Sequence, residues 1–230
     1  MIHRHRLFRV FLISVSALLL CSANIGALAH SDASYFTDIN GWYRPAIEYN
    51  VSLGIFHGIS EDTFLPDQPM TQAMLVTVLG RIAENYGKII EDVQRSDRWY
   101  AKYATWATIE EIIPYQELPF SQNGVITREV FAAYLCNFMD YLEIKLVEFR
   151  ENGGLYHYTW NDPSYSVPLM DFPPKEEIPT LWTETAIFSV MLNNVMLGYA
   201  DNTFRPHKPI TRAEACQVFL RTGQNFLFVT

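Results

Sequence analysis

The sequence has 230 residues, 49% of them hydrophobic and 18% charged, a composition typical of a globular protein with one or two domains. Its formal net charge is −8, with 17 basic and 25 acidic residues, which makes nucleic acid and anionic membranes poor partners. An anionic ligand would have to be held by a local site, because the overall field repels it.

The first element in chain order is a predicted signal peptide over residues 1–29. Three arginines precede an apolar run from Val10 to Leu20, and Ala-Leu-Ala at 27–29 fits a cleavage site. Cleavage after Ala29 predicts a secreted protein with a mature net charge of −11. Two alternatives stay open: an uncleaved membrane anchor, and a lipid-modified Cys21, which is weaker because a bulky leucine precedes it.

A helix–loop–helix unit is predicted within residues 30–90. Its first helix starts near Trp42, and the loop GISEDTFLPDQP follows at residues 58–69. Its second helix starts at Thr71, a residue type that caps helix N-termini, and continues with apolar residues at helical spacing. The tryptophan is either a core anchor or a platform for a sugar ring.

This unit recurs twice, which predicts a repeat protein. Residues 42–82 align without a gap to residues 182–222, with twelve identical residues. A middle copy starts at Trp99, and its threonine, Thr127, follows after 28 residues instead of 29. The predicted repeats occupy residues 30–90, 91–147 and 169–230. In each loop a phenylalanine seven residues before the threonine is expected to fix the loop to the core: Phe64, Phe120 and Phe204.

Between the second and third repeats lies a predicted insertion at residues 148–168, a hairpin or an ordered loop. It carries Tyr156, Tyr158 and Trp160 close to a Gly-Gly pair. These aromatic residues either stack on a sugar or cover the side of the helical bundle.

Cysteines, histidines and acids give no chemical signature. Cys136 and Cys216 are either two buried thiols or one disulfide. The six histidines do not recur at metal-ligand spacing, so no metal and no cofactor is expected. Acidic pairs such as Glu110-Glu111 accompany no nucleophile or phosphate loop, and the chain is not expected to be an enzyme.

The stretch PITRAEA, residues 209–215, poses an electrostatic question. Thr211 and Glu214 form the Thr-x-x-Glu pattern of a capping box, which places Arg212 at the first helical position. The helix dipole is positive there, so a cation costs a few tenths of a kcal/mol, roughly, in the empty helix. Arg212 therefore either awaits an anion, pairs with a nearby carboxylate, or points into solvent.

Together, the motif T-F-x-P-x-x-x-I-T-R-A-E, the tryptophan-initiated helix and the glycine loop resemble the S-layer homology (SLH) repeat, over nearly the whole mature chain. The resemblance implies an all-α fold of three helix–loop–helix repeats in a pseudo-threefold helical bundle. It also implies a secreted protein on the cell wall of a Gram-positive-type bacterium. There it would anchor without covalent bonds, binding an anionic, typically pyruvylated secondary cell-wall polysaccharide in grooves between repeats.

By the same resemblance, the motif arginine and nearby loop groups contact the carboxylate of the glycan. A carboxylate at the start of a helix would also meet free backbone N–H groups. The predicted glycan-binding residues are Arg212, Arg128, Thr211, Thr127, Gly198, Gly58, Trp182, Trp99 and Trp42.

Departures from the motif rank the three predicted sites. Gln72 replaces the arginine in the first copy, so that site is expected to be weak or silent. The second copy keeps Arg128 but has Pro114 in place of the glycine. The site of Arg212 is the best supported. The alternative function is a structural or protein-interaction role, with a surface protein partner and glycan binding lost.

Overall fold

The computed structural model describes residues 35–93, 95–146, 181–201 and 203–227. The chain divides into Met1–His30, which lies outside these residues, and Ser31–Thr230. The predicted signal peptide and the predicted insertion at 148–168 both lie outside the described residues. Within the described residues, no helix combines the length and apolarity that a membrane span requires.

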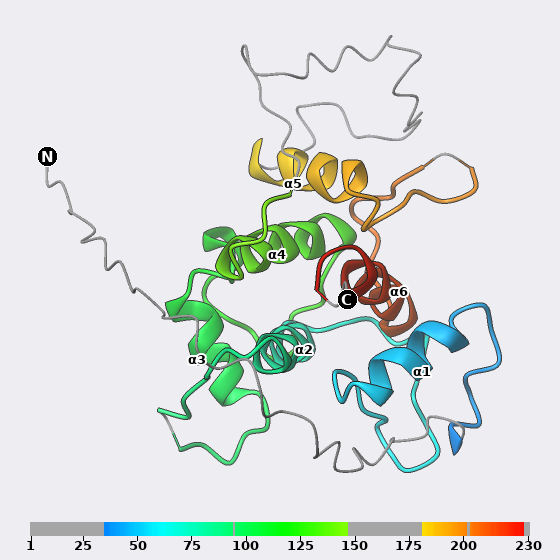
Figure 1. Cartoon of the computed structure of the whole chain (residues 1–230), viewed down its shortest axis with the longest axis horizontal. Helices are drawn as coiled ribbons and strands as arrows, with labels where there is room; N and C mark the ends of the chain where they lie inside the picture. Colours follow the sequence, from blue (N-terminus) through cyan, green and yellow to red (C-terminus); the bar gives the residue numbers. More distant parts are fainter. Residues whose placement is uncertain (1–34, 94, 147–180, 202, 228–230) are drawn as a thin grey trace, which may run out of the picture. The chain divides into compact units, whose positions relative to one another are not determined.

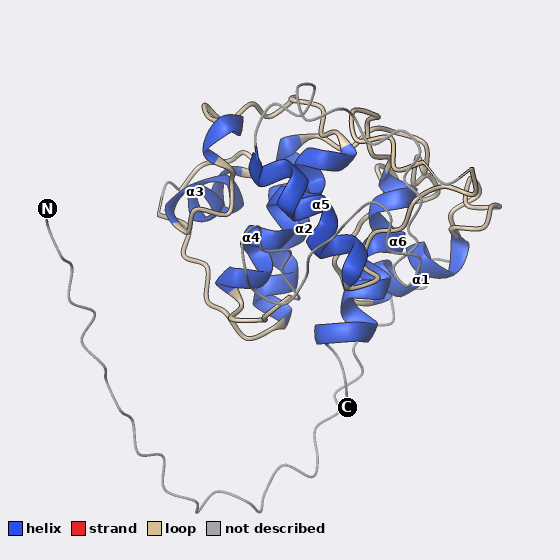
Figure 2. Ribbon diagram, turned by 90° about the horizontal axis from the view of Figure 1, so that it is seen from above, coloured by secondary structure: helices blue, strands red, loops and turns tan. Residues whose placement is uncertain are grey.

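The described part of the chain is all-α, as predicted (Figures 1 and 2). Its only β-type pairing is a set of isolated bridges near the starts of three helices. The helices are α1 (Arg44–Ser52), α2 (Gln72–Asn85), α3 (Ala101–Ile109), α4 (Arg128–Tyr141), α5 (Leu181–Leu192) and α6 (Arg212–Thr222), with a 3₁₀ turn η2 (Tyr115–Glu117) and a π-helical turn η4 (Gly223–Leu227).

The predicted N-caps start the second helix of every repeat. Helices α2, α4 and α6 begin directly after Thr71, Thr127 and Thr211. The capping box of α6 is confirmed: Glu214 N–H donates to Thr211 Oγ1 at 3.2 Å, and Thr211 N–H donates to Glu214 Oε2 at 3.0 Å. The Thr127 side chain makes no cap hydrogen bond.

A closed ring of backbone hydrogen bonds joins the three residues that precede these caps. Met70 N–H donates to Ile210 O at 2.8 Å, Ile210 N–H to Ile126 O at 3.0 Å, and Ile126 N–H to Met70 O at 3.0 Å. All three side chains are fully buried. Each repeat thus supplies one donor and one acceptor, and the starts of α2, α4 and α6 are held together.

The first helix of one repeat packs on the second helix of another. The packed pairs are α1 with α6, α2 with α3, and α4 with α5 (Figure 1). The α2–α3 pair approaches closely at Gly80, where a Cβ atom would lie 2.0 Å from Tyr103 Cδ1. Phe131 of α4 and Phe219 of α6 meet edge to face, 5.5 Å apart. The repeats therefore interleave, because each apolar stripe is completed by a neighbouring repeat.

The core-anchor interpretation of the tryptophans is wrong for two of the three. Trp42 and Trp99 are 65% and 59% exposed, and each stands before the first helix rather than in it. Helix α1 starts only at Arg44 and buries Ala46 and Ile47 instead. The side chain of Trp182 lies outside the described residues.

The two cysteines are thiols, which excludes the disulfide alternative. Cys216 is buried, and its burial raises the pKa of the thiol. Cys136 is only half-buried, on α4, and its Sγ lies 3.8 Å from Ala186 O.

Candidate ligand-binding junctions between repeats

Three junctions link a loop of one repeat to the start of a second helix in another. We name the loops loop 1 (residues 57–70), loop 2 (residues 113–126) and loop 3 (residues 197–210). Loop 1 meets α6, loop 2 meets α2, and loop 3 meets α4. At every junction the first residue of the helix reaches into the neighbouring loop, and we call that residue the clamp.

Arg212 is the clamp of loop 1, and no carboxylate of the described residues accepts its hydrogen bonds. Its Nε donates to Phe64 O at 3.0 Å, and its Nη2 donates to His57 O at 2.7 Å. The guanidinium carbon lies 4.3 Å from the centroid of the Phe64 ring. The residue is only 6% exposed, and this burial lowers the pKa of Arg212, although arginine keeps its proton in proteins.

Arg128 holds loop 3 through the same contacts. Its Nε donates to Phe204 O at 2.8 Å, and its Nη2 donates to Leu197 O at 2.9 Å. The residue is 4% exposed, and its guanidinium carbon lies 4.6 Å from the Phe204 ring centroid. Both arginines therefore bridge the residue before the loop glycine and the buried phenylalanine.

Gln72 takes the same place at loop 2, where the sequence departs from the motif. Its Oε1 accepts a hydrogen bond from Ser121 N–H at 2.7 Å, and its Nε2 donates to Glu117 Oε2 at 2.8 Å. An amide has one acceptor and one donor end, so it bridges a backbone N–H and a carboxylate instead of two carbonyl groups. The glutamine is thus a clamp of a different chemistry.

The expectation that free helix N–H groups await an anion at α6 is wrong. Arg212 N–H donates to Gln68 O and Ala213 N–H donates to Pro66 O, both at 2.9 Å. Glu214 N–H is taken by the Thr211 cap. The positive end of the helix dipole thus faces carbonyl groups of loop 1. Other carbonyl groups of the same loop accept the hydrogen bonds of the guanidinium group.

Gly58 is a position where other parts of the protein pack closely against the backbone. A Cβ atom there would lie 2.4 Å from Phe36 Cε1 and 2.5 Å from Ser60 O. The left-handed residues of these loops are instead Leu65, with a φ of 59°, and Arg205, with a φ of 55°. Neither is glycine, asparagine or aspartate, so no sequence signal marked them. Gly198 is exposed.

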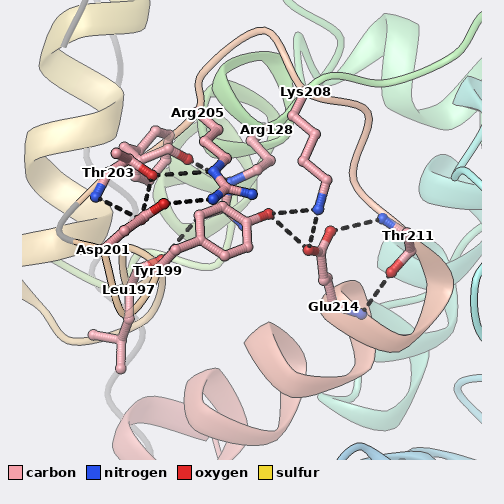
Figure 3. A network of polar contacts seen from close by, with 10 residues as sticks. Arg128, Leu197, Tyr199, Asp201, Thr203, Arg205, Lys208, Thr211 and Glu214 are labelled. Atoms are coloured by element: carbon pink, nitrogen blue, oxygen red, sulfur yellow. Dashed lines mark hydrogen bonds and ion pairs between the residues drawn. The ribbon is translucent and has the colours of Figure 1, made fainter. Parts of the chain in front are cut away.

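Loop 3 carries a polar network that sequence reasoning missed (Figure 3). Tyr199 Oη donates to Glu214 Oε1 at 2.7 Å, and Lys208 Nζ donates to both, at 2.9 Å and 3.0 Å. Arg205 donates to Asp201 Oδ2 at 2.6 Å. The cationic groups of Arg128, Arg205 and Lys208 lie 4.8, 4.2 and 4.8 Å from the centroid of the Tyr199 ring.

Two carboxylates of this network have lowered pKa values. For Glu214, burial would raise the pKa, but hydrogen bonds from Thr211 N–H, Tyr199 and Lys208 together outweigh it. For Asp201, hydrogen bonds from Thr203 and then Arg205 lower the pKa to about 2. Both groups are therefore ionised at neutral pH and hold the cations in place.

The lowered pKa of Asp201 predicts a pH dependence of stability. Because the folded pKa is below the unfolded one, its stabilising effect is complete above pH ~4 and is lost as the pH falls to ~2. We expect Asp201→Asn to unfold at a lower temperature than the unchanged protein at pH 6, with the gap closing by pH ~2. Thermal unfolding followed by circular dichroism between pH 2 and 6 measures it, and a gap independent of pH would contradict the assignment.

Comparison with known proteins places this architecture in a family. Residues 35–73 and 188–216 match the model of the S-layer homology domain. The first match covers α1, loop 1 and the start of α2, and the second covers the end of α5, loop 3 and the start of α6. Two segments of the chain are therefore similar to the S-layer homology domain. The family is one of non-enzymatic anchoring modules, in agreement with the prediction that the chain is not an enzyme. The middle copy rests on the self-similarity of the sequence.

An alignment over most of the chain connects it to a surface-layer protein. It is similar to the Surface-layer 125 kDa protein of Lysinibacillus sphaericus, with 24% identity over 224 residues. The alignment covers 94% of this chain but only 17% of that relative. The chain thus spans less than a fifth of the length of that relative.

Proposed function

We propose that this chain is a cell-wall anchoring module that binds an anionic, pyruvylated secondary cell-wall polysaccharide at the junctions between its three repeats. S-layer homology domains anchor S-layer proteins to the cell wall, and the chain carries such domains. A location at the cell surface and export by a signal peptide over residues 1–29 belong to the same proposal.

The observation that carries the proposal is the exposure of equivalent tryptophans. Trp42 and Trp99 occupy the same position in two repeats, and each packs edge to face on the tyrosine that follows, at 5.5 and 5.4 Å between ring centroids. An exposed indole packed against a second ring is a platform on which an apolar sugar face can stack.

The ring of Met70, Ile126 and Ile210 and the three clamps support a pseudo-threefold bundle with the repeat boundaries 30–90, 91–147 and 169–230. Each contact recurs between one repeat and the next, and closes on the first. In this arrangement the three junctions correspond to one another, and Thr127, Thr211, Gly58, Gly198 and Trp182 remain predicted contacts of the ligand.

Binding to the cell wall tests the proposal. We expect the full chain to pellet with sacculi that carry the secondary polymer and to remain in solution when the polymer has been removed chemically. Trp42→Ala and Trp99→Ala should each weaken pelleting roughly tenfold, because truncating an interface tryptophan costs on the order of 1–2 kcal/mol. Both residues are mostly exposed, so the unfolding temperature should change little.

Ile89→Ala is the matched control, because this side chain is 89% exposed and lies in neither a junction nor a platform. It should bind as the unchanged chain does. Equal pelleting with stripped and intact sacculi would exclude the polymer as the ligand.

One observation favours the alternative, a protein-interaction role without glycan binding. Arg128 and Arg212 are buried and hold loops in place, so the motif can persist for stability alone. This alternative requires a surface protein partner, and it predicts no dependence of pelleting on the wall polymer.

A further inference from the structure

The three junctions share a backbone but differ in the side chains that line them. At loop 3 the residues around the clamp are Tyr199, Arg205 and Lys208. The equivalent residues of loop 1 are Ile59, Leu65 and Gln68. One junction therefore presents cationic side chains where another presents apolar and neutral ones.

We propose that the anionic ligand binds at the junction of loop 3 and α4, and that Arg205 and Lys208 select this junction over that of loop 1. The proposal rests on the anchoring function proposed above and names the junction that holds the negative charge of the polymer. It reverses the ranking from the motif alone, which favoured the site of Arg212.

The two cations are accessible yet held in position. Their side chains are 43% and 39% exposed. Tyr199 lies against both, and Asp201 and Glu214 fix their directions. Two of the three N–H donors of Lys208 have acceptors among the described residues, which leaves one for a ligand carboxylate. A charge-assisted hydrogen bond formed by a pre-positioned group loses little entropy on binding.

At loop 1, carboxylates near the junction oppose the binding of an anion. Asp38 accepts hydrogen bonds from Phe64 N–H and from Leu65 N–H, at 2.9 and 2.7 Å, so a carboxylate already occupies the donors there. The Asp62 carboxylate lies in the same loop, held by Ser60 and Thr63. Because the chain is strongly acidic overall, an anion gains nothing from the general field and meets local repulsion at loop 1.

At loop 2 the clamp is uncharged and its partner is acidic. Gln72 contributes no positive charge, and Glu117 adds a carboxylate to the junction. Of the three junctions in the described part of the chain, that of loop 3 is therefore the one with a charged clamp and exposed cations together. Of its own acids, Asp201 and Glu214 are engaged with these cations, Tyr199 or the Thr211 cap, and Glu129 is engaged with His207.

Exchanging residues between the two loops tests the inference. Arg205→Leu combined with Lys208→Gln gives loop 3 the side chains of loop 1, and the left-handed φ at position 205 is one that Leu65 already adopts. We expect this variant of the full chain to lose at least tenfold in pelleting with polymer-bearing sacculi. The reverse exchange, Leu65→Arg combined with Gln68→Lys, should retain full binding.

Lys88→Gln combined with Lys145→Gln is the control for net charge, because it removes two positive charges outside the junctions. It should bind like the unchanged chain. If the loop 3 variant does not fold, as judged by thermal unfolding, Lys208→Gln alone provides the measurement and should also weaken binding.

The outcomes separate the two proposals. Polymer-dependent pelleting of the unchanged chain and of the Lys88/Lys145 control, lost in the loop 3 variants, supports both. Polymer-dependent pelleting that survives in a folded loop 3 variant overturns this inference and leaves the anchoring function standing. An unchanged chain that does not pellet with polymer-bearing sacculi overturns the anchoring function and, with it, this inference.

Discussion

Replacing Arg212 by alanine should destabilise the protein by about 2–4 kcal/mol and lower its melting temperature by roughly 5–15 °C. The substitution removes two hydrogen bonds from a charged donor and leaves Phe64 O, which is buried, without its partner. It also removes the side-chain link between loop 1 and α6, while the backbone hydrogen bonds of Arg212 and Ala213 to that loop remain. Thermal unfolding of the full chain measures the effect.

Two further variants distinguish a structural role of Arg212, bridging two carbonyl groups, from the effect of its positive charge alone. Arg44→Ala removes an exposed arginine whose side chain is 47% accessible and pairs with Glu48 at the surface, so it should cost less than about 0.5 kcal/mol. Arg212→Lys keeps the charge but cannot span both carbonyl groups, and should fall between the two. If Arg212→Ala melted like Arg44→Ala, the arginine would not be a structural clamp.

Phe64→Ala should destabilise the protein by about 3–5 kcal/mol, because it empties a fully buried site. The ring packs against Phe36 and Phe56, at 5.6 and 6.1 Å between centroids, and beneath the Arg212 guanidinium group. The cavity would therefore weaken loop 1 and its clamp together. Denaturant unfolding gives the free-energy difference.

The same substitution in loop 2 provides an internal comparison. Phe120 is only half-buried, so Phe120→Ala should cost less, about 1–2 kcal/mol. Phe204 is fully buried like Phe64, and Phe204→Ala should match the larger loss. Equal losses at Phe64 and Phe120 would show that burial of this ring does not set the stability of the loops.

These contacts answer the electrostatic question of an arginine at the first position of a helix. A cation there is unfavourable for an isolated α6. In the folded chain the guanidinium group lies against loop carbonyl oxygens, and further carbonyl groups of the same loop accept the first helix N–H groups. The negative charge that Arg212 required is thus supplied by the backbone of another repeat.

The departure at Gln72 acquires a different meaning for the same reason. From sequence alone, losing the arginine indicated a weak or silent site. The structure shows that Gln72 still holds its loop, through Ser121 and Glu117. A missing arginine therefore does not imply a missing junction, although it does remove a positive charge from it.

Local rules were enough to predict much of this protein from its sequence. The caps at Thr71, Thr127 and Thr211 depend only on neighbouring residues, so the starts of α2, α4 and α6 were predicted correctly. Self-similarity predicted the repeats, and the recurrence of a phenylalanine seven residues before each cap predicted the burial of Phe64 and Phe204.

Only the tertiary structure decided what those residues touch. The ring of Met70, Ile126 and Ile210, the carbonyl partners of Arg212, and the cations around Tyr199 all join segments far apart in the chain. A sequence pattern records which residue types recur, but not which loop a helix start meets in space. The exposure of Trp42 could not be predicted from the sequence either, because it depends on where α1 begins relative to the neighbouring elements. The local pattern of caps and apolar spacing was therefore enough to predict the fold class. The contacts of the candidate site depend on packing between segments far apart in the chain.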